Sequence, residues 1–184
     1  IVYLSSTNES TSTSWLYTVN KSTGTPTLIG VLTNAPLMIA IAINNNGQMY
    51  GYDMNTDVML SINKATGAGT LIGSIGFDAG YGQGMDFDPI TGTLYLSAFN
   101  ASTFQAELRT GNTTTGSTTL VGLLGSTTPG GLVQLGWLGL PGEPFDCAWL
   151  TESPVSGLIP ASGNQIVDIF VDATGLTAGT YNCD

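Results

Sequence analysis

Short runs of alternating hydrophobic and polar residues cover most of the chain, and turns rich in Asn, Thr and Gly separate them. Leu60 and Ile62 alternate with polar neighbours, residues 63–67 supply Asn, Thr and Gly, and residues 70–73 lead back. Alternation with a period of two around a short Gly-containing turn is typical of an antiparallel β-hairpin. The pattern therefore predicts an all-β fold that is built from hairpins.

An internal repeat organises these hairpins. Residues 19–30 (VNKSTGTPTLIG) recur as residues 62–73 (INKATGAGTLIG), and a looser copy follows at residues 112–122. A second motif lies between the copies, as NGQMYG at residues 46–51 and TGTLYL at residues 91–96. Units of roughly 45 residues that contain four short strands are typical of propeller blades. The repeat therefore predicts propeller-like antiparallel blades.

These motifs resemble the propeller-type repeats of large secreted bacterial proteins, in which a hairpin is followed by a segment that reads GMDFDPxTGTLY. In this chain the hairpin is residues 60–73 and the segment is residues 84–95. The resemblance covers residues 1–125 and implies a propeller-like domain of three incomplete units. It implies little about function.

The C-terminal part has a different character. Residues 126–131 are rich in Ser, Thr, Pro and Gly and are interpreted as a linker, and an apolar strand is expected at residues 132–140. The alternating strand at residues 166–172 and the ending ATGLTAGTY at residues 173–181 resemble the Ig-like sandwich modules of bacterial surface and secreted proteins. This resemblance implies that residues 132–184 form part of an Ig-like β-sandwich.

Charge and composition narrow the function. Charged residues make up only 9% of the chain, and 13 acidic residues against 3 basic ones give a formal net charge of −10. Binding to nucleic acid or to an anionic membrane surface requires clustered cations, so neither partner is expected. The longest apolar stretch, residues 35–43, is about half the length of a membrane-spanning helix. A β-rich chain of this composition is expected outside the cell.

The two ends of the chain carry a separate expectation. The chain opens on Ile1 rather than Met, so we expect that a leader was removed or that the sequence is a piece of a longer chain. The first residues match the middle of a repeat unit, and the last match the opening of a sandwich. We therefore expect the edge strands at residues 1–5 or 166–183 to pair with another copy.

The two cysteines, Cys147 and Cys183, are spaced for neither a metal knuckle nor a redox pair. A structural disulfide between them is expected if the compartment is oxidising. Two separate buried thiols remain the alternative.

Acceptor motifs for N-linked glycans (Asn-x-Ser/Thr) occur at Asn8, Asn20, Asn100 and Asn112. All four lie in polar, turn-like stretches, where we expect an attached sugar to be exposed. At least one of them is expected to carry a glycan.

Catalytic chemistry is not indicated. The chain has no histidine, which is the commonest general base and metal ligand. Asp86 and Asp88 share one strand face, as paired catalytic carboxylates do, but a turn-capping role is favoured. Residues 53–57 (DMNTD) have alternating oxygen ligands, yet Lys64 stands where a calcium loop has its bidentate Glu, so an Asx turn is favoured. No enzyme activity, metal or cofactor is predicted.

Aromatic side chains offer one candidate binding residue. Most of them recur in register with the repeat, which favours packing over a sugar-binding platform. Tyr81 is the exception, because it lies in the Gly-rich segment 80–84 outside the repeated motifs. Tyr81 is therefore the candidate ligand-binding residue.

The leading hypothesis is a structural glycoprotein subunit of an extracellular filament, surface layer or adhesin, with copies of itself and covalent glycans as partners. The alternative is a glycan- or ligand-binding module of a larger secreted protein. Self-association would favour the first, and selective retention on a polysaccharide would favour the second.

Overall fold

The computed structural model describes residues 1–125, 150–153, 166, 168–172 and 174. By its internal contacts the chain divides into two units, Ile1–Pro141 and Gly142–Asp184, and each is treated by itself. The described residues form thirteen strands and no helix, so no described helix spans a membrane. The expected linker, the apolar run at 132–140 and both cysteines, Cys147 and Cys183, lie outside the described residues.

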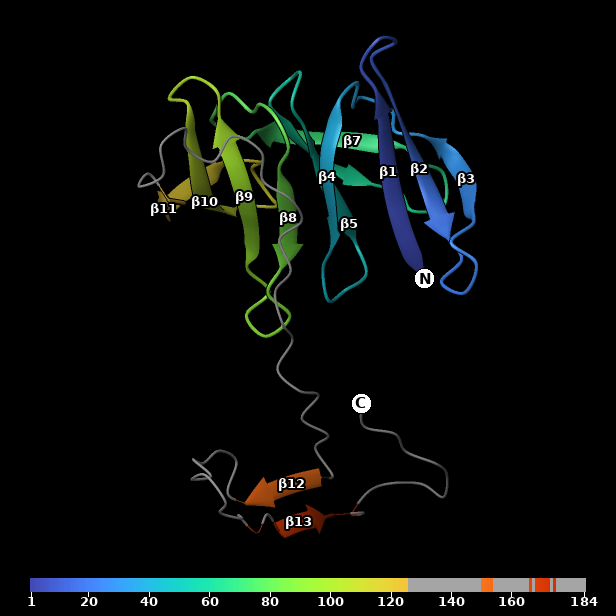
Figure 1. Ribbon diagram of the computed structural model, residues 1–184, viewed down its shortest axis with the longest axis vertical. Helices are drawn as coiled ribbons and strands as arrows, with labels where there is room; N and C mark the ends of the chain where they lie inside the picture. The colour runs from blue at the N-terminus through green and yellow to red at the C-terminus, as the bar shows by residue number, and fades with distance from the viewer. Residues whose placement is uncertain (126–149, 154–165, 167, 173, 175–184) are drawn as a thin grey trace. The chain divides into compact units, whose positions relative to one another are not determined.

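The first sheet has three antiparallel strands in the order β1-β2-β3 (Figure 1). We call it blade 1. Its strands are β1 (Val2–Asn8), β2 (Thr13–Val19) and β3 (Pro26–Val31). Within the described residues β1 pairs with β2 alone, so β1 has one free edge.

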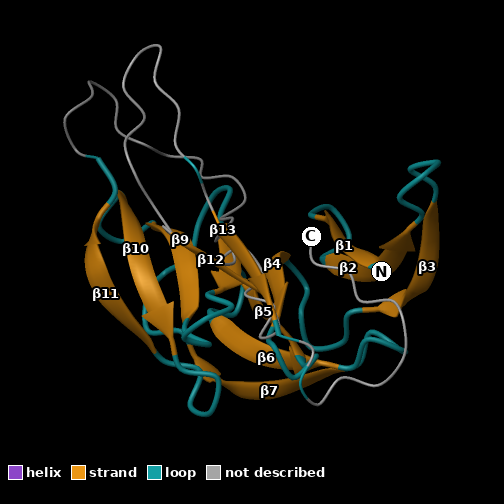
Figure 2. Cartoon of the chain, turned by 90° about the horizontal axis from the view of Figure 1, so that it is seen from below, coloured by secondary structure: helices purple, strands orange, loops and turns teal. Residues whose placement is uncertain are grey.

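The second and third sheets, blades 2 and 3, each have four antiparallel strands in chain order. Blade 2 consists of β4 (Met38–Ile43), β5 (Met49–Asp53), β6 (Val58–Ile62) and β7 (Gly69–Ser74). Blade 3 consists of β8 (Gly84–Phe87), β9 (Leu94–Asn100), β10 (Gln105–Gly111) and β11 (Thr118–Leu123). The chain thus has the all-β, propeller-like architecture that the repeat predicts. Figure 2 shows the blades one after another.

The expectation of three incomplete units is wrong for two of the three. Blades 2 and 3 each contain four strands, whereas the described residues supply three strands for blade 1 and leave its first position without one. The apolar stretch at residues 35–43 is too short for a membrane-spanning helix. It contains β4, which is the first strand of blade 2. Both faces of β4 carry apolar residues, so its sequence shows no alternation and its membership of a blade is hard to see.

The last hairpin of every blade contains the same irregularity. Its register shifts by one residue at corresponding places, which are Leu16/Tyr17, Met59/Leu60 and Leu108/Arg109. Because the bulges lie at corresponding positions, they define which residues of the three blades are equivalent. Val2, Met49 and Leu94 then occupy one equivalent position, each paired with the residue that precedes a turn asparagine.

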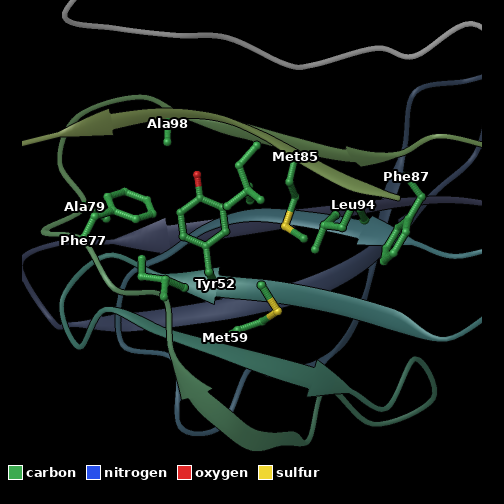
Figure 3. Close-up of a cluster of buried hydrophobic side chains, with 12 residues drawn as sticks. Tyr52, Met59, Phe77, Ala79, Met85, Phe87, Leu94 and Ala98 are labelled. Atoms are coloured by element: carbon green, nitrogen blue, oxygen red, sulfur yellow. The ribbon is translucent and has the colours of Figure 1, made fainter. Parts of the chain in front are cut away.

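Two hydrophobic cores lie between successive blades. The core between blades 1 and 2 contains Leu16, Leu32, Ala35, Met38, Met49, Leu60 and Ile62. The core between blades 2 and 3, part of which Figure 3 shows, is built around Tyr52, Met59, Phe77, Met85, Leu94 and Leu96. Each blade is therefore held mainly by the faces of its neighbours.

A buried polar network fixes blade 3 to the connection that precedes it. The guanidinium of Arg109 pairs with the carboxylate of Glu107 and donates to the Thr118 hydroxyl at 2.9 Å. The same guanidinium lies 4.5 Å from the ring centre of Phe77, a cation–π contact. Both charged side chains are at most 10% exposed, so the network replaces the solvent that each has lost.

The second unit is described only in part. Strands β12 (Leu150–Ser153) and β13 (Asp168–Val171) form an antiparallel pair. The β13 strand lies within the alternating segment expected at residues 166–172. The Ig-like sandwich and its boundaries remain predictions.

Candidate functional site

The contact between successive blades depends on glycine. In blade 2 the turn at residues 63–67 lies against Gly30 of β3, and a Cβ added to Gly30 would overlap the Thr66 carbonyl oxygen. The Thr33 N–H also donates to the Gly67 carbonyl at 3.3 Å. This turn therefore packs directly against the backbone of the preceding blade, at a glycine that has no side chain.

The same contact recurs between blades 2 and 3. The turn at residues 112–116 lies against Gly73 of β7, and a Cβ on either Gly73 or Gly116 would overlap the facing backbone. The Thr118 N–H donates to the Ile75 carbonyl at 3.1 Å. One interface is thus used twice within this chain.

Blade 3 carries the receiving glycine of this interface and blade 1 carries the docking turn. Neither is covered by another described blade. Gly122 of β11 corresponds to Gly30 and Gly73, and a Cβ on Gly122 would meet no described atom within 4 Å. Gly24, at the tip of the blade 1 turn, likewise has no described neighbour within 4 Å of a Cβ. In the described part of the chain, a receiving glycine and a docking turn are therefore both uncovered.

The flanking side chains show the same difference. Val121 is 56% exposed, whereas the equivalent Ile72 packs half-buried against the core between blades 2 and 3. Val2 is 41% exposed, whereas Met49 and Leu94 at the equivalent position contact the preceding blade and are buried. Both ends thus expose apolar residues at positions that are buried or half-buried inside the stack.

Three of the four candidate glycan acceptors are exposed: Asn8, Asn20 and Asn112. Each side-chain oxygen accepts backbone N–H groups of its own turn; that of Asn20 accepts from Ser22 at 2.9 Å and from Thr23 at 3.2 Å. These Asx turns form the hairpins that the sequence predicts.

The expected exposure is wrong at Asn100. This side chain is 8% exposed, and its Nδ2 atom donates to the Glu107 carboxylate at 3.2 Å. A glycan would have to be attached at that same nitrogen. The Asn-x-Ser pattern does not reveal this, because burial depends on the facing strand.

The candidate calcium loop is an Asx turn, as favoured. The Oδ1 atom of Asp53 accepts the Asn55 and Thr56 N–H groups, and Oδ2 accepts the Leu37 N–H. No group of three or more metal-ligating acidic, His or Cys side chains occurs in the described part of the chain. Both Asp53 oxygens therefore have structural hydrogen bonds.

Asp88 has a similar role in the turn after β8. The Thr91 hydroxyl and the Ile90 N–H hold the pKa of this exposed carboxyl below its ordinary value. A carboxyl with a lowered pKa stays charged at neutral pH, whereas a general acid must hold a proton. The turn-capping interpretation of Asp88 is confirmed.

Tyr81 belongs to a corner of three aromatic rings. The Tyr81 and Phe104 rings are 48% and 60% exposed, and both stand nearly perpendicular to buried Phe99, at centre distances of 5.0 and 5.2 Å. Hydrogen bonds from Gly80 N–H to Phe99 O and from Ala101 N–H to Asp78 O join the two loops. The loops thus hold two exposed rings edge to face, with ring centres 6.2 Å apart.

The backbone at both exposed rings is strained. Tyr81 and Phe104 each have a φ of 57°, a left-handed conformation that is rare for bulky residues. Blades 1 and 2 place Ser12 and Asp57 at the hairpin position of Phe104. The bulky aromatic is therefore specific to blade 3.

A buried hydrogen-bond chain supports the Tyr81 loop from below. The Tyr52 hydroxyl donates to Gln83 Oε1 at 3.0 Å, and Gln83 Nε2 donates to the Gly80 carbonyl at 2.9 Å. Complete burial raises the pKa of Tyr52, which therefore stays a neutral donor. The sequence pattern identifies Tyr81 as a candidate but not Phe104. The one sign of Phe104 in the sequence is that the equivalent hairpin position holds Ser12 in blade 1 and Asp57 in blade 2.

The blades define a propeller-like all-β protein. No family model matches the chain, and no curated protein matches it. Among solved structures it is similar to a protein of unknown function from Bacteroides thetaiotaomicron, with 22% identity over 59% of this chain and 27% of that one (TM-score 0.46).

Two further solved structures are similar. A chain of a nidogen/laminin complex has 18% identity over 60% of this chain and 40% of that one (TM-score 0.44). The calcium-binding protein regucalcin from Agrobacterium tumefaciens has 14% identity over 66% of this chain and 40% of that one (TM-score 0.45). These neighbours are β-propeller-like proteins, and the chain spans 27% to 40% of their lengths.

Proposed function

We propose that this protein is a non-enzymatic structural glycoprotein subunit of an extracellular filament, surface layer or adhesin, which assembles by intermolecular β-strand pairing. The observation that carries the proposal is the free edge of β1. Blades 2 and 3 each have a fourth strand at the position that blade 1 leaves uncovered. An extended segment of another copy would complete blade 1 by β-strand addition.

The composition supports an extracellular assembly. A free strand edge with exposed Val2 and Leu4 is a template for association, and this one carries no charged side chain that would discourage pairing. Asn8, Asn20 and Asn112 all lie on exposed turns, and glycans at Asn8 and Asn112 would shield surface that is not used in assembly.

Self-association tests the proposal. We expect the native chain to form species whose mass rises with concentration in sedimentation velocity. The double variant Val2→Lys/Leu4→Lys should stay monomeric and folded, because both side chains are over 40% exposed in the single chain. Leu28→Lys is the matched control, since Leu28 and its equivalent Leu71 are both 56% exposed and neither is covered by the next blade.

Two results would contradict the proposal. The first is a native chain that remains monomeric at every concentration. The second is undiminished assembly of the double lysine variant.

The alternative function, glycan binding, is favoured by the aromatic corner of Tyr81 and Phe104. Exposed rings held by strained backbone offer flat apolar faces, on which the faces of pyranose sugars stack. The net charge of −10 favours a neutral saccharide over an anionic one.

Retention on neutral polysaccharides tests this alternative. Tyr81→Ser and Phe104→Ser should each abolish retention, whereas Ile90→Ser should leave it unchanged. Ile90 is a suitable control because it is 61% exposed and lies in the turn at the other end of β9. Equal retention of all three variants would exclude the corner as the binding site.

A further inference from the structure

We propose that copies of this chain join end to end through the same interface that joins its blades: the turn at residues 20–24 of one copy docks on Gly122 of the next. This inference rests on the proposed assembly and names the surfaces involved. It predicts packing of blade 3 of one copy against blade 1 of another.

This interface already occurs twice within the chain. Turn 63–67 seats on Gly30, and turn 112–116 seats on Gly73. In each case an Asn at the start of the turn accepts backbone N–H groups, and a Gly at its end has a φ between 71° and 82° in all three blades. Turn 20–24 therefore has the shape that fits such a glycine.

The apolar residues around the two halves of the interface are complementary. Ile29 and Ile72 pack against the core shared with the following blade, whereas the equivalent Val121 is 56% exposed. Met49 packs toward the preceding blade, whereas the equivalent Val2 is 41% exposed. Docking blade 3 on blade 1 would bury Val121 and Val2 in a third core of the same kind.

Among the described residues, blade 1 has no counterpart of the strand that opens blades 2 and 3. Strand β4 begins after a connection at residues 32–37, and β8 begins after a connection at residues 75–83. In the sequence, eight residues (124–131) separate the end of β11 from the apolar run 132–140 (LVQLGWLGL), a spacing between those of the two connections. This run lies outside the described residues, but its spacing and composition make it the donor that we propose for the free edge of β1 in the next copy.

The partner that binds the surface around Gly122 is a second copy of the chain, because one chain carries both halves of the contact. The receiving half is Gly122 with Val121, and the docking half is turn 20–24 with Val2. Two different surfaces that fit each other form a head-to-tail contact, which propagates as a filament or closes as a ring. A partner unrelated to this chain would have to reproduce a blade.

A single methyl group tests the contact. Gly122→Ala adds a Cβ that meets nothing within 4 Å in the single chain. The isolated chain should therefore fold and be at least as stable, since Ala is favoured over Gly within a strand. In the assembly the same Cβ would overlap the docked turn, and we expect association to weaken roughly tenfold to a hundredfold.

Two further variants complete the experiment. Leu120→Thr, on the same strand, should assemble normally, because Leu120 and its equivalents Leu28 and Leu71 are all exposed. Leu135→Pro should stop assembly, because proline cannot donate to a strand ladder. Mass is measured by sedimentation velocity, and folding by circular dichroism.

The outcomes separate this inference from the proposed function. If the native chain assembles and Gly122→Ala assembles equally well, the docking of turn 20–24 is wrong while assembly stands. If Leu135→Pro assembles like the native chain, the donor strand is wrong. If the native chain never assembles, the inference and the proposed function both fail.

Discussion

Gly73 of β7 faces the carbonyl oxygen of Thr115 in the next blade so closely that only a hydrogen fits between them. Gly73→Ala should therefore destabilise the chain, by about 2 kcal/mol, since backbone on both sides resists displacement. Urea unfolding measures the loss. Gly122→Ala is the control, because it makes the same change on the equivalent strand at an uncovered position. Equal stability of the two variants at a concentration where the chain is monomeric would show that the glycine contact is not needed.

The ion pair of Glu107 and Arg109 leads to a second prediction. Arg109→Met leaves Glu107 buried without its cation, and we expect a loss of about 3 kcal/mol in the free energy of unfolding. The double variant Arg109→Met/Glu107→Gln should recover most of the loss, because no buried charge is then unpaired and the amide oxygen still accepts from Asn100 Nδ2. A double variant as unstable as the single one would assign the loss to packing against Phe77 instead.

Asp57 gives a prediction for pH. Burial raises the pKa of this carboxyl, the hydrogen bond from the Ala79 N–H opposes the rise, and the charges of Asp78 and Asp53 add to it. In the pH window between the ordinary pKa and the raised one, the folded chain holds a proton that the unfolded chain has lost. The free energy of unfolding therefore falls as pH rises through this window.

Asp57→Asn should remove that fall while it keeps the bond to Ala79. The gain at neutral pH should not exceed about 0.5 kcal/mol, because solvent reaches the carboxyl and screens its charge. Thermal unfolding between pH 3 and pH 7 measures the effect. A variant with the same pH slope as the native chain would show that another group causes the slope.

Glycan occupancy should follow exposure rather than the sequence motif. We expect sugars on at least one of Asn8, Asn20 and Asn112, and none on Asn100, whose Nδ2 atom is bonded to buried Glu107. Glycopeptide mass spectrometry of native material decides the matter. A glycan at Asn100 would mean that blade 3 is modified before it folds, and bare asparagines at all four sites would remove the glycoprotein proposal.

Local features of the fold could be predicted from sequence, and long-range ones could not. The asparagine and glycine of turn 20–24 shape the backbone of their own turn through local contacts. The hairpins and the propeller-like repeat can therefore be predicted from the sequence. Gly122, by contrast, looks like any strand glycine until the three blades are superposed. The role of Phe104 likewise depends on Tyr81, which a different loop brings beside it.

The placement of both hydrophobic cores between blades also determines how the protein opens. Within the described residues, blade 2 has a packed neighbour on each side, whereas blades 1 and 3 each have one. Arrays of this kind are held by nearest-neighbour energies and fray from the outside inward. Amide hydrogens of β5 and β6 should consequently exchange with deuterium most slowly, and those of β1 and β11 fastest. Joining copies would slow exchange first at these two terminal strands, so the deuterium pattern would reveal which surfaces meet.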